Sequence, residues 1–112
     1  MKRFVQTLDL RDDPRLIAEY RRLHSREGVW QEIIDGIRSV GIKAMDIYLR
    51  GTRLVMIVET DDDFDWDTQM ARLAAAPRQA EWETLTARYQ VAAADASSAE
   101  KWKMMEQIFT LY

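Results

Sequence analysis

The segment between residues 42 and 60 constrains the fold more than any other part of this chain. It contains two strand-like stretches, IKAMDIYL (residues 42–49) and RLVMIVET (residues 53–60), joined by RGT (residues 50–52). A short connection that contains glycine between two such stretches predicts a β-hairpin. The second stretch is apolar on both faces over residues 54–58, which predicts a strand at the centre of its sheet.

The remaining elements follow from hydrophobic spacing and from the signals at helix ends. Residues 3–10 alternate loosely and predict a strand. Asp13 before Pro14 predicts the start of a helix, and Gly28 predicts its end. The closing stretch MMEQIFTLY predicts a final strand with Met105, Gln107, Phe109 and Leu111 on one face. The other predicted elements are helices over residues 29–40, 64–75 and 78–89 and a loop over residues 92–101.

These elements give the order βααββααβ within a single domain, residues 1–112. Two βαβ-like halves around a central hairpin predict an α+β fold of the ferredoxin-like type, an antiparallel sheet with helices on one face. The strands carry too many apolar side chains on both faces for the uncovered face to be wet. Two sheets packed together would cover it, so we expect a homodimer that forms a dimeric α/β barrel.

The composition excludes several classes of protein. The chain has no cysteine, which excludes disulfides, iron–sulfur clusters, zinc ribbons and thiol catalysis. The formal net charge of -3 and the scattered basic residues argue against a nucleic-acid partner. The N-terminus lacks the pattern of a signal peptide, and no apolar run approaches the ~20 residues that a membrane-spanning helix needs. We therefore expect a cytoplasmic protein without a membrane partner.

The acidic run TDDDFDWD (residues 60–67) invites a calcium-binding interpretation. An EF-hand loop that starts at the first aspartate would need glycine at its sixth position and glutamate at its twelfth, where this chain has Trp66 and Arg72. Capping of free N–H groups at the start of the third predicted helix explains the negative charge better. With one histidine and no cysteine, we expect no transition-metal site either.

His24 is the only histidine of the chain, and it follows Tyr20 by four residues on the apolar stripe of the first predicted helix. A lone histidine on such a stripe is more often a core residue than a catalyst. Its neighbour favours chemistry, because side chains four residues apart on a helix lie on one face. An imidazole can donate or accept a proton near pH 7, and a phenol can hydrogen-bond to either form. The pair suits proton transfer without a cofactor.

The tryptophans allow two interpretations. A tryptophan in a small domain usually packs in the core, as expected for the buried stripe of the second predicted helix. An indole beside a cleft can also stack on the apolar face of a sugar ring. The sequence leaves both interpretations open for Trp30, Trp66, Trp82 and Trp102.

The segment EYRRLHSREGVW resembles the L-rhamnose mutarotase family, whose members carry a tyrosine, a histidine four residues later and a tryptophan that opens the next helix. Tyr20, His24 and Trp30 match these positions. The likeness continues in SVGIKAMDIYL, LVMIVET, QAEWETL and MMEQIFTLY and covers nearly the whole chain. It implies an enzyme that interconverts the α and β anomers of a monosaccharide on a dimeric α/β barrel, with no metal or organic cofactor. In this likeness His24 would be the proton donor, and Tyr20 and Trp82 would line the sugar pocket.

The departures from the family pattern bear on the substrate. Met45 stands where members of the well-known type carry a second tyrosine, and Glu81 precedes Trp82 where they carry paired tryptophans. Two residues are also inserted between the histidine and the tryptophan of the second helix. We expect Met45 and Glu81 to contact the substrate and to change its hydrogen bonds, which makes L-fucose or another deoxy or acidic sugar a competitor of L-rhamnose. Two other functions stay open: a cofactor-free monooxygenase on the same barrel, and a small-molecule-binding barrel without turnover.

Overall fold

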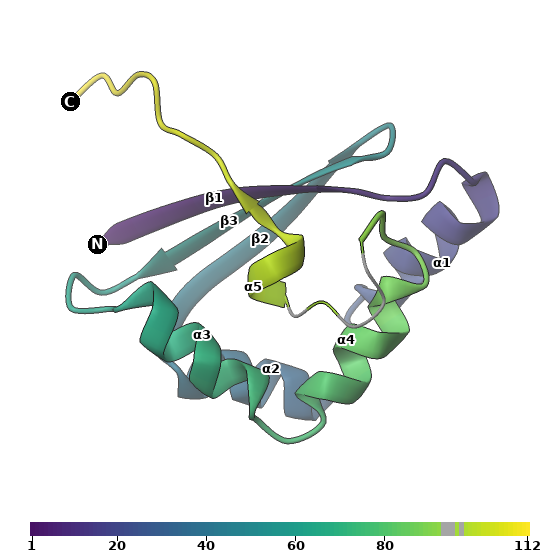
Figure 1. The fold of residues 1–112 in the computed structure, drawn as a ribbon, viewed down its shortest axis with the longest axis horizontal. Coiled ribbons are helices and arrows are strands. Elements are labelled where there is room, and N and C mark those ends of the chain that lie inside the picture. Colours follow the sequence, from purple (N-terminus) through teal and green to yellow (C-terminus); the bar gives the residue numbers. More distant parts are fainter. Residues whose placement is uncertain (93–95, 97) are drawn as a thin grey trace.

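A four-stranded antiparallel sheet forms one layer of the molecule (Figure 1). The computed structural model describes residues 1–112 except 93–95 and 97. The strands are β1 (Lys2–Asp9), β2 (Ile42–Arg50), β3 (Arg53–Thr60) and β4 (Lys103–Met104), in the order β2-β3-β1-β4. β2 and β3 form the predicted hairpin, and Gly51 in its turn has a φ of +60° that favours glycine. β3 lies between β2 and β1, so the prediction of a central strand is confirmed.

The helices lie on one side of the sheet (Figure 1). Asp13 caps the first, because its carboxylate accepts a hydrogen bond from the backbone N–H of Arg15 at 2.9 Å. Asp65 caps the third by accepting from the backbone N–H of Thr68 at 2.9 Å, which confirms capping by the acidic run. Within the described part of the chain, no helix has the length and apolarity that crossing a membrane requires. The four longer helices are α1 (Pro14–Leu23), α2 (Gln31–Ser39), α3 (Trp66–Ala74) and α4 (Gln79–Ala87).

The core lies between the helices and the face of the sheet that they cover. Along β3, the fully buried Leu54 and Val58 alternate with Val55 and Ile57, which are half-buried on the opposite face. The antiparallel register places Leu8 of β1 opposite Leu54, so the covered face is apolar across both central strands. Side chains from the helices and the C-terminal part complete this core, among them Tyr20, Val40, Phe64, Leu73 and Trp102.

α1 ends at Leu23, five residues before the predicted end at Gly28. The hydroxyl of Ser25 donates to the carbonyl oxygen of Arg22 at 2.7 Å and accepts from the backbone N–H of Gly28 at 3.2 Å. This local bonding competes with the helix and folds the chain back on its last turn. A Cβ atom on Gly28 would clash with the Arg22 carbonyl oxygen, so the turn requires glycine. His24 consequently lies at the end of the helix, at its C-cap.

The C-terminal part differs most from the prediction. A short helix, α5 (Ser98–Lys101), falls within the predicted loop over residues 92–101, and residues 93–95 and 97 of that loop lie outside the described residues. The predicted final strand is wrong beyond its first residue. β4 pairs only Lys103 and Met104 with β1, and the backbone N–H of Met105 donates to the Val5 carbonyl oxygen at 2.7 Å.

Residues 106–112 then leave the sheet and project from the molecule (Figure 1). Phe109 is 76% exposed and Leu111 is 73% exposed. An alternating pattern forms a strand only where a neighbouring strand and an apolar surface are present. Within one chain, the described residues provide neither to this C-terminal tail.

Candidate active site

A cavity of about 570 Å³ lies between the helices and the sheet. This volume is within the range of roughly 300–1,000 Å³ that small-molecule sites occupy. The end of α1, the helices α2 and α4 and the edge strand β2 supply most of its wall. The wall is largely apolar and includes Ile33, Ile37, Met45, Ile47, Met56 and Trp82.

His24 is part of this wall at the end of α1. Its Nδ1 atom lies 2.8 Å from the backbone carbonyl oxygen of Tyr20. A carbonyl oxygen only accepts hydrogen bonds, so the neutral imidazole carries its proton on Nδ1 and keeps Nε2 as an acceptor. Burial lowers the pKa of His24 from its ordinary value near 6.5, against the smaller raising effect of the bond to Tyr20. The side chain is therefore a neutral base at pH 7.

Tyr20 lies directly against this imidazole, with 4.2 Å between the two ring centroids. Burial raises the pKa of Tyr20 to about 12, so the phenol keeps its proton at neutral pH. The side-chain Nε2 of Gln90 donates a hydrogen bond to its hydroxyl oxygen at 3.4 Å. Tyr20 thus presents a phenolic proton beside a histidine that presents a lone pair.

Trp82 on α4 lines the cavity beside His24. Its ring lies edge-on to His24 with 5.5 Å between centroids, and Trp30 lies edge-on to Trp82 with 5.1 Å between centroids. The guanidinium carbon of Arg78 lies 4.0 Å from the centroid of the Trp30 ring, a cation–π contact. These contacts link the base in the cavity to a charged group at the surface.

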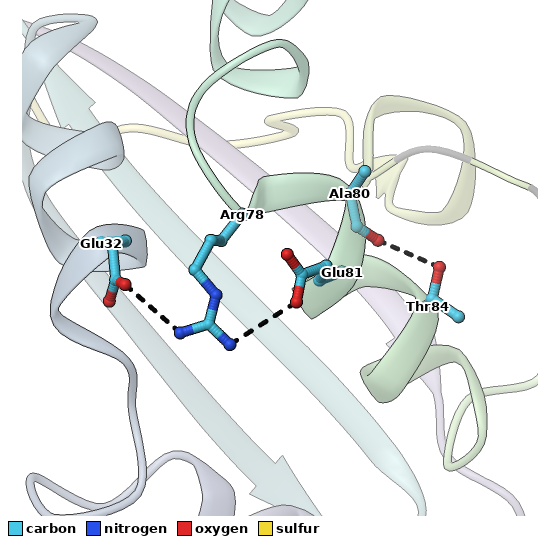
Figure 2. A network of polar contacts seen from close by, with 5 residues as sticks. All are labelled: Glu32, Arg78, Ala80, Glu81 and Thr84. Carbon is cyan, nitrogen blue, oxygen red and sulfur yellow. Dashed lines mark hydrogen bonds and ion pairs between the residues drawn. The ribbon is translucent and has the colours of Figure 1, made fainter.

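Arg78 also joins α2 to α4 through two carboxylates (Figure 2). Its Nη1 atom lies 3.2 Å from Glu32, and its Nη2 atom lies 3.5 Å from Glu81. Glu81 is exposed and does not line the cavity. Adjacent helix residues point about 100° apart, so the helix that directs Trp82 inward directs Glu81 toward Arg78.

The structure therefore brings together four of the five residues that the sequence singled out. Tyr20, His24, Met45 and Trp82 all line the cavity. Met45 lies on β2 opposite the buried Val58 of β3, on the face of the sheet that the helices cover. Glu81, the fifth, does not line the cavity in the structure.

The charged side chains of the wall are all cationic among the described residues: Arg26, Arg38 and Lys43 line the cavity, and no aspartate or glutamate does. A neutral or anionic ligand matches such a wall better than a cationic one. His24 is consequently the wall residue whose side chain ordinarily titrates near neutrality. Among the described residues, no group of three or more His, Cys, Asp or Glu could hold a metal ion.

Two buried glutamines in the wall were not predicted from the sequence. Gln79 is 4% exposed and Gln90 is 2% exposed, and both line the cavity. The carbonyl oxygen Oε1 of each has no hydrogen-bond partner among the described residues. Glutamine is usually a surface residue, and neither position carries a pattern that would mark it as buried. Their unpaired carbonyl oxygens place two hydrogen-bond acceptors in an otherwise largely apolar wall.

Comparison with known proteins identifies relatives along the whole chain. The sequence model of a family described as L-rhamnose mutarotase matches residues 3–111. The L-fucose mutarotase of Xanthomonas campestris pv. campestris is 39% identical over 111 residues, which cover 99% of this chain and 89% of that protein. A UPF0734 protein of Dictyostelium discoideum is 34% identical over 114 residues, which cover 98% of this chain and 90% of that protein.

Two solved structures share the fold over the full length of both chains. The L-rhamnose mutarotase of Formosa agariphila has a TM-score of 0.72, and the tetracenomycin F2 cyclase of Streptomyces glaucescens has a TM-score of 0.56. Each is 14% identical in sequence, a level at which the likeness concerns the fold alone. The family match and the sequence relatives are more specific. By both, this chain belongs to the L-rhamnose mutarotase family of carbohydrate isomerases.

Proposed function

We propose that this protein is an aldose mutarotase that interconverts the α and β anomers of a deoxy sugar, with His24 as the acid–base group. The observation that carries the proposal is a neutral imidazole with a fixed Nδ1 proton, in a cavity whose wall contains no carboxylate among the described residues. The name of the Xanthomonas relative makes L-fucose the first sugar to test, and the family name makes L-rhamnose the second. Both are neutral monosaccharides that carry several hydroxyl groups.

Mutarotation needs one proton to leave the anomeric hydroxyl and one to reach the ring oxygen. Nε2 of His24 takes the proton of the anomeric hydroxyl as the bond between C1 and the ring oxygen breaks and the C1 carbonyl forms. The ring oxygen accepts a hydrogen bond from Tyr20 and receives the proton that His24 carries. The open-chain sugar rotates about its C1–C2 bond, and the same steps in reverse close the ring as the other anomer. The cycle consists of two proton transfers, reversible cleavage of the bond between C1 and the ring oxygen, and one bond rotation, so we expect no cofactor.

Two features of the wall support a sugar as the ligand. Trp82 supplies an aromatic ring beside His24, at 5.5 Å between centroids, next to which the apolar face of a pyranose can lie. Gln79 and Gln90 supply polar groups that are unpaired among the described residues, and sugar hydroxyls can donate to such groups. Met45, at the position where the resemblance expects a tyrosine, lines the same wall and supplies no hydroxyl, which favours a different pattern of hydroxyl recognition.

We further propose that the active protein is a homodimer in the cytoplasm. On the face of the sheet away from the helices, Val5, Val55 and Ile57 are half-buried, and Tyr48 is 60% exposed. The C-terminal tail adds Ile108, which is 89% exposed, together with the exposed Phe109 and Leu111. These half-buried and exposed apolar side chains are ones that a partner chain would cover. A second copy of the chain carries the same surface, so a twofold pair would cover both.

Saturation transfer between the α and β anomeric protons, observed by NMR, tests the activity. Wild-type protein should accelerate the exchange of L-fucose or L-rhamnose, and His24→Ala should lose that acceleration while its thermal unfolding stays cooperative. The faster sugar would identify the preferred substrate. Absence of acceleration with either sugar by folded wild-type protein would contradict the proposal. Ligand-induced thermal stabilisation in that case would indicate a binding protein without turnover.

A further inference from the structure

Gln90 is a buried polar residue at the end of the α4 region, and the proton transfers outlined above do not involve it. Its backbone forms an isolated antiparallel bridge with Leu10, and its side chain is 2% exposed. Among the described residues, the side-chain amide makes one hydrogen bond, from Nε2 to the hydroxyl oxygen of Tyr20 at 3.4 Å. Its carbonyl oxygen has no partner among the described residues.

Stability alone does not account for glutamine at this position. A buried carbonyl group without a partner lowers stability, and an apolar side chain of the same shape would avoid that cost. Buried polar groups that are only partly satisfied often mark functional positions. The bond from Gln90 to Tyr20 joins residues 70 positions apart in the sequence at the wall of the cavity.

The direction of this bond determines what the phenol can do. An amide N–H only donates, so the hydroxyl oxygen of Tyr20 is the acceptor and its own proton is left for another group. The described residues provide no second partner for that hydroxyl. The ring of His24 lies 4.2 Å from that of Tyr20, but among the described residues no hydrogen bond joins its Nε2 to the Tyr20 hydroxyl. An oxygen of a bound ligand is therefore the acceptor that remains for the phenolic proton.

We infer that Gln90 is a positioning residue, which holds the Tyr20 hydroxyl so that its proton is donated to the substrate. This inference rests on the proposed mutarotase function. A donor aimed at the ring oxygen stabilises the transition state, in which that oxygen gains negative charge, more than the bound sugar. Loss of Gln90 should consequently lower kcat and change KM less.

Gln90→Met and Gln6→Met form a matched pair of variants. Gln6 is also 2% exposed with an unpaired carbonyl oxygen among the described residues, but it does not line the cavity and forms no hydrogen bond with Tyr20. In saturation-transfer kinetics, Gln90→Met should lower kcat about threefold to tenfold, whereas Gln6→Met should leave it within about twofold. Equal kcat values for the two variants would overturn the inference.

Gln90→Glu gives a readout that a purely structural role would not produce. A protonated glutamic acid can donate to Tyr20, but its carboxylate can only accept and would take the phenolic proton away from the substrate. The rings of His24 and Tyr89 pack on Tyr20, and Tyr20 is the titratable group bonded to position 90. The rate of Gln90→Glu relative to wild type should fall as pH rises, while the relative rate of Gln90→Met stays constant. A ratio for Gln90→Glu that does not change with pH would contradict the inference.

The ¹³Cζ resonance of Tyr20 reports the hydrogen bond without any turnover. We expect the resonance to move in Gln90→Met and to stay in place in Gln6→Met. An unmoved resonance in Gln90→Met would overturn the inference even in an active enzyme. Failure of the proposed function would give a different result. Wild-type protein would then show no accelerated anomer exchange, although the Tyr20 resonance would still differ between wild type and Gln90→Met.

Discussion

The imidazole Nδ1 of His24 lies 2.8 Å from the backbone carbonyl oxygen of Tyr20, one helical turn earlier in the chain. This contact depends on the end of α1 at Leu23, because the last carbonyl groups of a helix have no partner in the helix itself. The carbonyl determines which ring nitrogen carries the proton. His24 is therefore prepared to act first as a base, and it becomes an acid only after it has taken a proton from the substrate.

The pH dependence of anomer exchange should show this role. Because burial lowers the pKa of His24 below its ordinary value, the active neutral form persists at pH 7 and is lost only as the pH falls through that lowered value. We expect the exchange rate to be constant between about pH 7 and 8 and to decline below about pH 6.5. Exchange rates measured from pH 4.5 to 8 check this. An exchange rate that decreases as the pH rises from 6 to 8 would instead indicate that the imidazolium is the form that starts the reaction.

The lowered pKa of His24 should also make the free energy of unfolding depend on pH, which tests the pKa independently of activity. In the window between the folded-state pKa and the ordinary value near 6.5, the unfolded chain binds more protons at this site than the folded chain. His24 therefore destabilises the protein as the pH falls through that window. His24→Gln removes the titration, so its free energy of unfolding should change less with pH than that of wild type over the same window.

Tyr20→Phe should separate the contribution of the hydroxyl to activity from that of the aromatic ring. The phenyl ring keeps its packing against His24 and Tyr89, but the donor to the substrate and the acceptor for Gln90 disappear. We expect the exchange rate to fall roughly tenfold to a hundredfold, and the free energy of unfolding to fall by about 1 kcal/mol. Tyr89→Phe is the control, because Tyr89 does not line the cavity and its variant should stay within about twofold of wild type.

Met45 and Glu81 should differ in their effect on sugar preference, although both depart from the family pattern. Met45 lines the cavity, whereas Glu81 pairs with Arg78 at the surface. We expect Met45→Tyr to raise the ratio of the L-rhamnose rate to the L-fucose rate by roughly tenfold, since a new hydroxyl in the wall must find a partner on the sugar. Glu81→Trp should change that ratio by less than about twofold. A larger effect at position 81 would place its side chain in the site after all.

Features set by neighbouring residues were predictable from the sequence. The hairpin follows from residues 50–52, the helix starts follow from Asp13 and Asp65, and the central place of β3 follows from its apolar run. The pairing of Tyr20 with His24 also follows from local spacing, although their place in a cavity required the family likeness. Each of these features leaves a signal within a few consecutive residues of the sequence.

Features set by distant parts of the chain were not predictable in this way. The bond between Gln90 and Tyr20 spans 70 positions, and no local pattern marks Gln90 as its partner. Which face of α4 lines the cavity depends on how α4 packs against α2, to which Arg78 is joined through Glu32. The last nine residues carry many apolar side chains, but a strand also needs a neighbour that the described part of one chain does not provide.

The left-handed backbone conformation of Arg78 should affect the stability of variants at this position. Its φ of 62° lies in the left-handed region, which glycine adopts more readily than alanine. Arg78→Gly and Arg78→Ala lose the same contacts with Glu32, Glu81 and Trp30, so the left-handed conformation is the main difference between them. Arg78→Gly should therefore unfold at a higher Tm than Arg78→Ala, by roughly 4 °C or more. Equal Tm values would show that the chain relaxes at this position.

The C-terminal tail should act in association and contribute little to the stability of a single chain. Phe109 and Leu111 are exposed in one chain, so Phe109→Asp together with Leu111→Asp should leave the free energy of unfolding of the isolated chain unchanged within about 0.5 kcal/mol. If a second copy covers these side chains, the same double variant should weaken the dimer at least tenfold, because two charged groups would enter an apolar interface. Sedimentation velocity over a range of concentrations measures the dimer dissociation constant.

Val91→Asp is the control, since Val91 is 59% exposed but lies outside the tail and its substitution should not affect association. A wild-type protein that remains monomeric at the highest concentration would contradict the homodimer, and an unchanged dimer in the double variant would exclude the tail from its interface.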